Sequence, residues 1–212
     1  MSLPVLLLGA GGHAKVLADM LRASGMETIG ILDPQPGLAG TSILGLPILG
    51  DDQLLDRFSP GELLLANGLG SVGLPVARRE LFERCVGRGY RFVTILHPSA
   101  IVAPDVQLGE GVQVMAGAVL QPGCCIGRNT IVNTRASLDH DCRIGDHVHI
   151  APGVTCSGNV TVGDTSHIGV GATVVQGVMI GSRSVVGAAS LVLRDVSSNS
   201  MVRGIPAQKV SV

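Results

Sequence analysis

An aliphatic side chain recurs at every sixth position through the second half of the chain, and this period constrains the fold more than any other feature. The series runs from Val102 to Val192 and contains sixteen residues, all of them Val, Leu or Ile except Cys156. At a hydrophobic content of 46%, an unbroken series of this length has chance odds of roughly a few in a million. The period therefore reflects a repeating structural unit.

Two further regularities accompany this series. From Leu108 to Val186, the residue four places after each member is Val, Ala, Cys, Thr or Ser. Glycine also recurs every eighteen residues, at Gly109, Gly127, Gly145, Gly163 and Gly181. Six residues can form one flat side with one inward side chain, and the small residue lets the chain turn at a corner. Three sides close a triangular coil, and coils stack at the strand spacing of ~4.8 Å.

The two periods predict a parallel β-helix, with about five full coils between Leu108 and residue 197. Aromatic residues make up only 2% of the chain, which agrees with a narrow interior. The first 96 residues instead alternate strand-like and helix-like runs, a pattern typical of a parallel sheet with helices on its faces. We therefore predict an α/β, Rossmann-like domain over residues 1–96 and an all-β domain with a C-terminal tail over residues 97–212.

The predicted elements of the first domain follow from its apolar patterns. Residues 34–50 are rich in Pro and Gly and are predicted to form an ordered loop or a short strand. Strands are predicted at residues 5–9, 28–33, 62–67 and 90–96, and helices at residues 13–25 and 74–89.

Charge and composition exclude several classes of protein. The formal net charge is −1 and Lys and Arg form no cluster, so nucleic-acid binding is not expected. Apolar runs are short and interrupted by Gly, so no membrane span is expected, and the first apolar run reads as a strand rather than a secretory signal. The five cysteines form no C-x-x-C pair, so we predict no disulfide framework and no metal site. A reducing cytoplasm is the simplest setting.

A glycine-rich segment, GAGGHA, lies between the first predicted strand and the first predicted helix. Gly9, Gly11 and Ala14 fit the dinucleotide fingerprint, with Asp33 after the second strand as the ribose-binding acid. Taken alone, this motif predicts NAD. The domain has too few predicted strands for a full dinucleotide fold, however, so a mononucleotide-sized ligand fits better.

The segment LDHDCRIGDHVH, residues 138–149, contains three of the six histidines. Leu138 belongs to the inward series, so His140 should point outward between Asp139 and Asp141. A neutral imidazole with a pKa near 6.5 accepts a proton at physiological pH, and one carboxylate can fix its tautomer. We predict His140 as a general base or as a group that orients the nucleophile, and the choice between the two aspartates stays open.

Several segments together carry a resemblance to a known family. They are the hexapeptide repeat, GAGGHAK, NTRASLDHDCRIGDHVHIAPG, CSGNVTVG and RGIPAQKV. The chain resembles the left-handed β-helix acyltransferases, specifically the nucleotide-sugar N-acetyltransferases of the bacillosamine and perosamine pathways and the sialic acid O-acetyltransferase type. This resemblance implies a left-handed coil, acetyl-coenzyme A as co-substrate, and a homotrimer with active sites in clefts between subunits.

The resemblance assigns roles to three groups of residues. The catalytic group comprises His140, Asp141, Asp139 and Asn133. The group predicted to contact acetyl-coenzyme A comprises His149, Gly158, Val170 and Ala188. The group predicted to hold the nucleotide comprises Gly11, Gly12, His13, Asp33 and Gly68. His147 is expected at the surface, and His167 in a surface ladder with His149.

The predicted function is transfer of acetyl from acetyl-coenzyme A to the amino group of a nucleotide-linked amino-deoxy sugar, for surface glycan biosynthesis. One alternative is a sugar O-acetyltransferase of the sialic acid type, which needs stronger base catalysis because a hydroxyl is a weaker nucleophile than an amine. Another is a non-catalytic NAD-binding or scaffold protein. The sugar, its amino position and the choice between UDP and GDP stay open, since Pro34 stands where relatives carry a second acid.

Overall fold

A five-stranded sheet forms the centre of the N-terminal domain in the computed structural model, which describes residues 3–210. Its strand order is β3-β4-β2-β1-β5, and all neighbours are parallel except the pair β3 and β4. The strands are β1 (Val5–Leu8), β2 (Thr28–Leu32), β3 (Ser42–Ile43), β4 (Leu46–Gly50) and β5 (Leu64–Asn67). The helices are α1 (Gly12–Ala23), α2 (Val76–Gly87) and the short 3₁₀ helix η1 (Asp52–Arg57).

The predicted elements of this domain are confirmed with one exception. Residues 34–50 contribute the antiparallel pair β3 and β4, and Gly25 ends α1 with a φ of 66°. The strand predicted over residues 90–96 is wrong for most of its length. Phe92 forms a single parallel bridge with Leu65 of β5, and only β6 (Ile95–Leu96) is a strand, which pairs with β9 of the coils. Tyr90 instead turns inward, where its hydroxyl donates to the carbonyls of Leu55 and Phe58.

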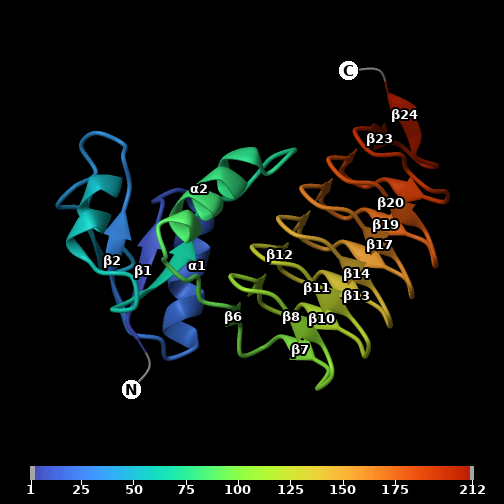
Figure 1. Ribbon diagram of the computed structural model, residues 1–212. Helices are drawn as coiled ribbons and strands as arrows, with labels where there is room; N and C mark the ends of the chain where they lie inside the picture. Colours follow the sequence, from blue (N-terminus) through green and yellow to red (C-terminus); the bar gives the residue numbers. More distant parts are fainter. Residues whose placement is uncertain (1–2, 211–212) are drawn as a thin grey trace.

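Three parallel sheets form the walls of the C-terminal prism (Figure 1). The β13 wall contains β7 (Ile101–Val102), β10 (Val119–Leu120), β13 (Ser137–Leu138), β16 (Thr155–Cys156), β19 (Thr173–Val174) and β22 (Leu191–Val192). The β14 wall contains β8 (Gln107–Leu108), β11 (Cys125–Ile126), β14 (Arg143–Ile144), β17 (Thr161–Val162) and β20 (Met179–Ile180).

The third sheet, the β15 wall, faces the N-terminal domain. It contains β6, β9 (Gln113–Val114), β12 (Ile131–Val132), β15 (His149–Ile150), β18 (His167–Ile168), β21 (Val185–Val186), β23 (Met201–Arg203) and β24 (Gln208–Val210). The last two strands pair antiparallel and close the final coil. Within the coils each strand pairs with the strand eighteen residues later, as Leu120 does with Leu138.

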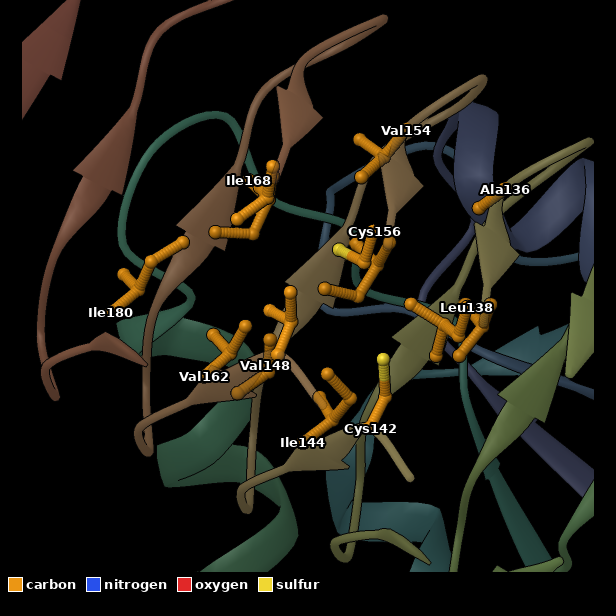
Figure 2. Packing of buried hydrophobic residues seen from close by; sticks show 14 of the residues in the cluster. Ala136, Leu138, Cys142, Ile144, Val148, Val154, Cys156, Val162, Ile168 and Ile180 are labelled. Atoms are coloured by element: carbon orange, nitrogen blue, oxygen red, sulfur yellow. The ribbon is translucent and has the colours of Figure 1, made fainter. Parts of the chain in front are cut away.

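The aliphatic series forms the interior of this prism, as its period predicts. Leu138, Ile144 and Val162 point inward and are almost fully buried (Figure 2). Cys156 takes its place in the same interior, and Cys142 fills a buried corner. Burial of each large aliphatic side chain contributes about 1.5–3 kcal/mol, so the stacked series stabilises the coils.

The glycine period has a separate cause, which is the close approach of backbones at one corner of the prism. This corner, called the Asn129 corner, comprises residues 127–130 and their equivalents at multiples of eighteen. A Cβ on Gly109 would lie 2.7 Å from the backbone nitrogen of Arg128, and one on Gly163 would lie 2.5 Å from that of Ser182. Any side chain there would push successive coils apart.

Two other corners complete each coil, and both matter for function. The Asn133 corner comprises residues 133–136, 151–154, 169–172 and 187–190, between the β15 and β13 walls. The His140 corner comprises residues 121–124, 139–142, 157–160 and 175–178, between the β13 and β14 walls. The α/β domain packs on the β15 wall, where Met115 and Ile131 join the apolar cluster of α1. Within residues 3–210, no helix is long and apolar enough to cross a bilayer.

We predict that Leu138→Ala lowers the free energy of unfolding by about 2–5 kcal/mol, because it leaves a cavity in a closely packed interior. Urea unfolding followed by circular dichroism measures the change. Arg143→Gln, on the exposed side of the next strand, is the matched control and should change it by less than about 0.5 kcal/mol. Equal effects of the two variants would contradict the assignment of the inward series.

Candidate active site

His140 and Asp141 form an exposed pair at the His140 corner. The Nδ1 atom of His140 lies 2.8 Å from Oδ2 of Asp141, whereas Asp139 accepts a hydrogen bond from the His140 backbone N–H at 2.8 Å. The structure therefore selects Asp141 as the partner of the ring. Asp141 adopts a φ of 61°, a left-handed conformation that Asp tolerates better than most residues. This corner geometry turns its carboxylate back toward the preceding imidazole.

The hydrogen bond to Asp141 raises the pKa of His140 above its ordinary value of 6.5. Because the carboxylate accepts a hydrogen bond from Nδ1–H, the neutral ring carries its lone pair on Nε2, the atom that can act as a base. That atom lies over Gly158, one coil away, where any Cβ would collide with the ring. Gly158, predicted to contact the coenzyme, thus provides room for the imidazole.

A second histidine, His149, lies on the β15 wall beside the Asn133 corner. Its Nε2 atom accepts a hydrogen bond from the Asn133 amide at 3.1 Å, and its Nδ1 atom lies 2.8 Å from the Ser71 hydroxyl. Burial, and then the neighbouring His167, lowers the pKa of His149 to about 3. His149 is therefore neutral at physiological pH, and both of its ring nitrogens have partners within the chain, so it cannot serve as a proton store.

The two predicted histidine neighbours of this region are not surface residues. The ring of His167 lies 4.9 Å from that of His149, one coil away as the register predicts, but it is only 9% exposed. His147 is 5% exposed and packs its edge against Phe82 of α2. The expectation of surface positions is wrong for both, because Phe82 of the α/β domain packs on His147 and the ring of His149 packs on His167. The hexapeptide period predicts which residues point out of the coils, but it does not predict which other parts of the chain cover them.

Within one chain, the predicted catalytic and coenzyme groups are each divided between two corners of the prism. Asn133 bonds to His149 and lies at the opposite end of β13 from His140. Val170 and Ala188 lie at the Asn133 corner, whereas Gly158 lies at the His140 corner. One copy of the chain therefore presents two separate half-sites on two corners of the prism.

A cavity of about 510 Å³ lies at the carboxyl edge of the α/β sheet, and Asp33 is the one residue of the predicted nucleotide group that lines it. It lies where the loops after β1 and β5 diverge, the position at which open α/β sheets bind ligands. Its lining residues are Gly9, Asp33, Pro34, Gln35, Asp52, Leu69, Ala77, Glu80, Leu81 and Arg84. Gly11 is the N-cap of α1 and has no side chain to cap the helix, and Gly12 is exposed, so the free amides there can bind phosphate.

Three residues predicted to hold the nucleotide also have structural contacts. Both Asp33 oxygens accept backbone amides, from Ala10 at 2.6 Å and Gln35 at 2.8 Å, so Asp33 shapes the glycine loop. Gly68 allows the backbone after β5 to approach β1 and α1, because a Cβ would lie 2.6 Å from the Leu8 carbonyl oxygen. His13 is turned toward the coils rather than the cavity.

A polar layer that the sequence does not reveal joins the two domains. The Nε2 atom of His13 lies 2.8 Å from Oε1 of Gln113 on β9, and burial followed by Arg78 lowers the pKa of His13 to about 4. Gln113 donates to the Asn67 carbonyl at 2.8 Å, and the Asn67 amide donates to Oδ1 of Asn129 at 3.1 Å. Nothing in the spacing of these residues distinguishes them from ordinary outward positions.

Comparison with known proteins identifies the family. Residues 4–85 match the family model described as the PglD N-terminal domain. The UDP-N-acetylbacillosamine N-acetyltransferase of Bacillus subtilis (strain 168) is 37% identical over 117 residues, 53% of this chain and 51% of that protein. The match thus spans about half the length of this curated relative.

Two groups of solved structures cover almost the whole chain. A histidine-to-asparagine variant of perosamine N-acetyltransferase from Caulobacter crescentus, in complex with CoA and GDP-perosamine, has a TM-score of 0.91 and 38% identity. That alignment covers 99% of this chain and 97% of the other. The acetyltransferase domain of PglB from Neisseria gonorrhoeae FA1090, in complex with acetyl coenzyme A, has a TM-score of 0.91 and 35% identity over 99% of this chain and 100% of the other.

These likenesses place the prism among the acetyltransferase β-helices. The predicted fold class is confirmed, an α/β Rossmann-like domain followed by a left-handed parallel β-helix. Within that class, the chain belongs to the family of nucleotide-sugar N-acetyltransferases.

We predict that Asp141→Asn lowers the pKa of His140, because it removes the negative partner that stabilises the imidazolium. A raised pKa keeps the ring protonated up to a higher pH, so activity that needs neutral imidazole is lost as pH falls through that pKa. The variant should therefore shift the acidic limb of the pH–rate profile to lower pH and reduce the maximal rate.

Histidine NMR titration measures this pKa directly. Asp139→Asn is the matched control, because Asp139 bonds to the backbone of His140 rather than to its ring. A larger shift in the Asp139 variant than in the Asp141 variant would contradict the assignment of the pair.

Proposed function

We propose that this chain transfers acetyl from acetyl-coenzyme A to the amino group of a nucleotide-linked amino-deoxy sugar. The observation that carries this proposal is the exposed pair of His140 and Asp141, in which the ring nitrogen Nε2 is left as an available base. Solved relatives that carry CoA, acetyl coenzyme A or GDP-perosamine support the choice of substrates. The cavity beside Asp33 and the free amides at Gly11 and Gly12 suit the nucleotide.

The residues suggest a direct transfer. The sugar amine attacks the thioester carbonyl carbon, and Nε2 of His140 accepts the proton that the nitrogen loses. Asp141 stabilises the imidazolium that forms. When the tetrahedral intermediate collapses, the carbon–sulfur bond breaks, the new amide remains on the sugar, and the departing thiolate takes the proton from His140. Neutral His149, whose ring nitrogens pair with Ser71 and Asn133, would lie near the thioester end of the coenzyme.

We propose further that the active enzyme is a homotrimer, because the half-sites of one chain face different corners. The α/β domain packs on β9, β12 and β15 of the β15 wall, and His140 lies at the corner opposite that wall. The β13 wall between the two half-sites carries no charged outward residue. Its outward side chains are those of Ile101, Val119, Ser137, Thr155, Thr173 and Leu191.

An uncharged wall with an Ile101 that is 66% exposed suits contact with other copies of the chain. If three such walls face a threefold axis, the His140 corner of each copy meets the Asn133 corner of the next. This contact would unite His140 with Asn133, His149, Val170 and Ala188. The proposed setting is the cytoplasm, in surface glycan biosynthesis, which suits the five free thiols.

Release of coenzyme A thiol, measured with a panel of UDP- and GDP-linked amino sugars, tests the activity. We expect His140→Asn to reduce turnover by about 10²–10⁴-fold if the ring is the base. Arg143→Gln, on the adjacent wall, is the control and should retain the wild-type rate. Thiol release only with hydroxyl acceptors would favour O-acetylation, and NAD binding without thiol release would favour a non-catalytic protein. A wild-type rate in His140→Asn would remove His140 from the mechanism.

The trimer has a separate test, the mixing of two inactive variants. We expect co-assembled His140→Asn and His149→Asn chains to regain activity, because a site built from two neighbouring copies can draw each intact histidine from a different chain. In a random 1:1 mixture, about one quarter of such sites are fully wild type. No recovery in co-assembled trimers would contradict a shared site.

A further inference from the structure

Arg78, in the first turn of α2, is the largest side chain that the structure buries completely. No carboxylate lies within ion-pair distance of it among residues 3–210. Burial lowers the pKa of its guanidinium to about 9, so the group stays charged at neutral pH. A buried charge without a counter-ion is costly, and its hydrogen bonds must offset that cost.

The hydrogen bonds of Arg78 reach both domains. Its Nη1 atom donates to the carbonyl oxygens of Asn67 and Leu69, each at 2.7 Å. Its Nε atom donates to the carbonyl oxygen of Asn129 at 3.1 Å, on a corner of the β-helix. The guanidinium thus holds the loop of residues 67–71 against the Asn129 corner.

That loop connects the two binding regions of the chain. Leu69 lines the cavity at the carboxyl edge of the α/β sheet, and Gly68 packs against β1. Two residues further on, the Ser71 hydroxyl lies 2.8 Å from Nδ1 of His149. A shift of the loop would therefore move a wall of the nucleotide cavity and the partner of His149 together.

The positive charge of Arg78 also acts on two histidines near the loop, His13 and His149. Burial, followed by the charge of Arg78, lowers the pKa of His13. Burial, followed by His167, His13 and then Arg78, lowers the pKa of His149. The other groups around these rings are Gln113, Asn133, Ser71 and His167. None of them carries a negative charge, but the hydrogen bonds of Gln113 to His13 and of Ser71 to His149 raise the two pKa values and partly oppose the guanidinium.

We propose that Arg78 is a positioning residue of the transferase site. It holds the loop of residues 67–71 on the β-helix, so that the nucleotide cavity and His149 keep fixed positions relative to each other. This inference rests on the proposed function. The fork geometry of the guanidinium is essential to it, because a lysine ammonium is a point charge on a flexible stem and cannot reproduce these three bonds.

Two variants test the proposal. Arg78→Lys keeps the positive charge but loses the forked guanidinium group. Arg78→Met keeps much of the packing but loses both the charge and the guanidinium group. In each we expect faster hydrogen exchange at the amides of residues 68–71, a higher KM for the nucleotide sugar and for acetyl-coenzyme A, and kcat/KM lower by about ten- to a hundredfold. The pKa of His149, measured by NMR, should rise in Arg78→Met and change little in Arg78→Lys.

The matched control is Arg79→Lys. The neighbouring Arg79 is partly exposed, and its Nε atom lies 3.7 Å from Oε1 of Glu83. It should leave loop exchange and both KM values unchanged. If the Arg78 variants only lower stability, with unchanged KM values and loop exchange in the folded fraction, the proposal is overturned. If the wild-type chain acetylates no nucleotide-linked amino sugar, the proposed function fails, and loop exchange still decides whether Arg78 holds the loop.

Should both Arg78 variants fail to fold, Ser71→Ala tests the other end of the loop. It removes the hydroxyl at His149 and leaves all bonds of Arg78 intact. We expect a higher KM for acetyl-coenzyme A, and an unchanged KM would overturn the link between the loop and His149.

Discussion

The stacking of one coil on the next is the constraint on which the rest of the structure depends. Each residue lies beside the residue eighteen places along, because parallel ladders join the coils on all three walls. Backbones approach so closely at the Asn129 corner that only glycine fits at positions such as Gly109 and Gly163. The same register places His149 beside His167 and His140 over Gly158.

This register gives each corner of the prism a different use. The Asn129 corner carries the α/β domain, through hydrogen bonds to Asn67 and Arg78. The Asn133 corner holds the neutral His149, and the His140 corner presents an imidazole whose pKa its aspartate raises. Because a triangular coil separates its corners by a whole wall, the two reactive corners of one copy point apart. An assembly of copies is therefore part of our proposed mechanism.

The walls and the interior could be predicted from the sequence because their signal is local and periodic. The choice of Asp141 over Asp139 could not, since it depends on the φ of 61° at a corner. The burial of His147 depends on the docking of the other domain, which no spacing within the repeat records. Arg78 stands next to Arg79 in the sequence, and only the folded structure shows which of the two is buried.

The central claim is that acetyl transfer occurs between the His140 corner of one copy and the Asn133 corner of the next. A crystal structure of the assembled enzyme with coenzyme A and a nucleotide-linked amino sugar tests it most directly. The account predicts that the coenzyme sulfur and the sugar amine lie between His140 of one copy and His149 of its neighbour. A bound pair of substrates enclosed by a single chain, or lying away from every His140, would contradict it.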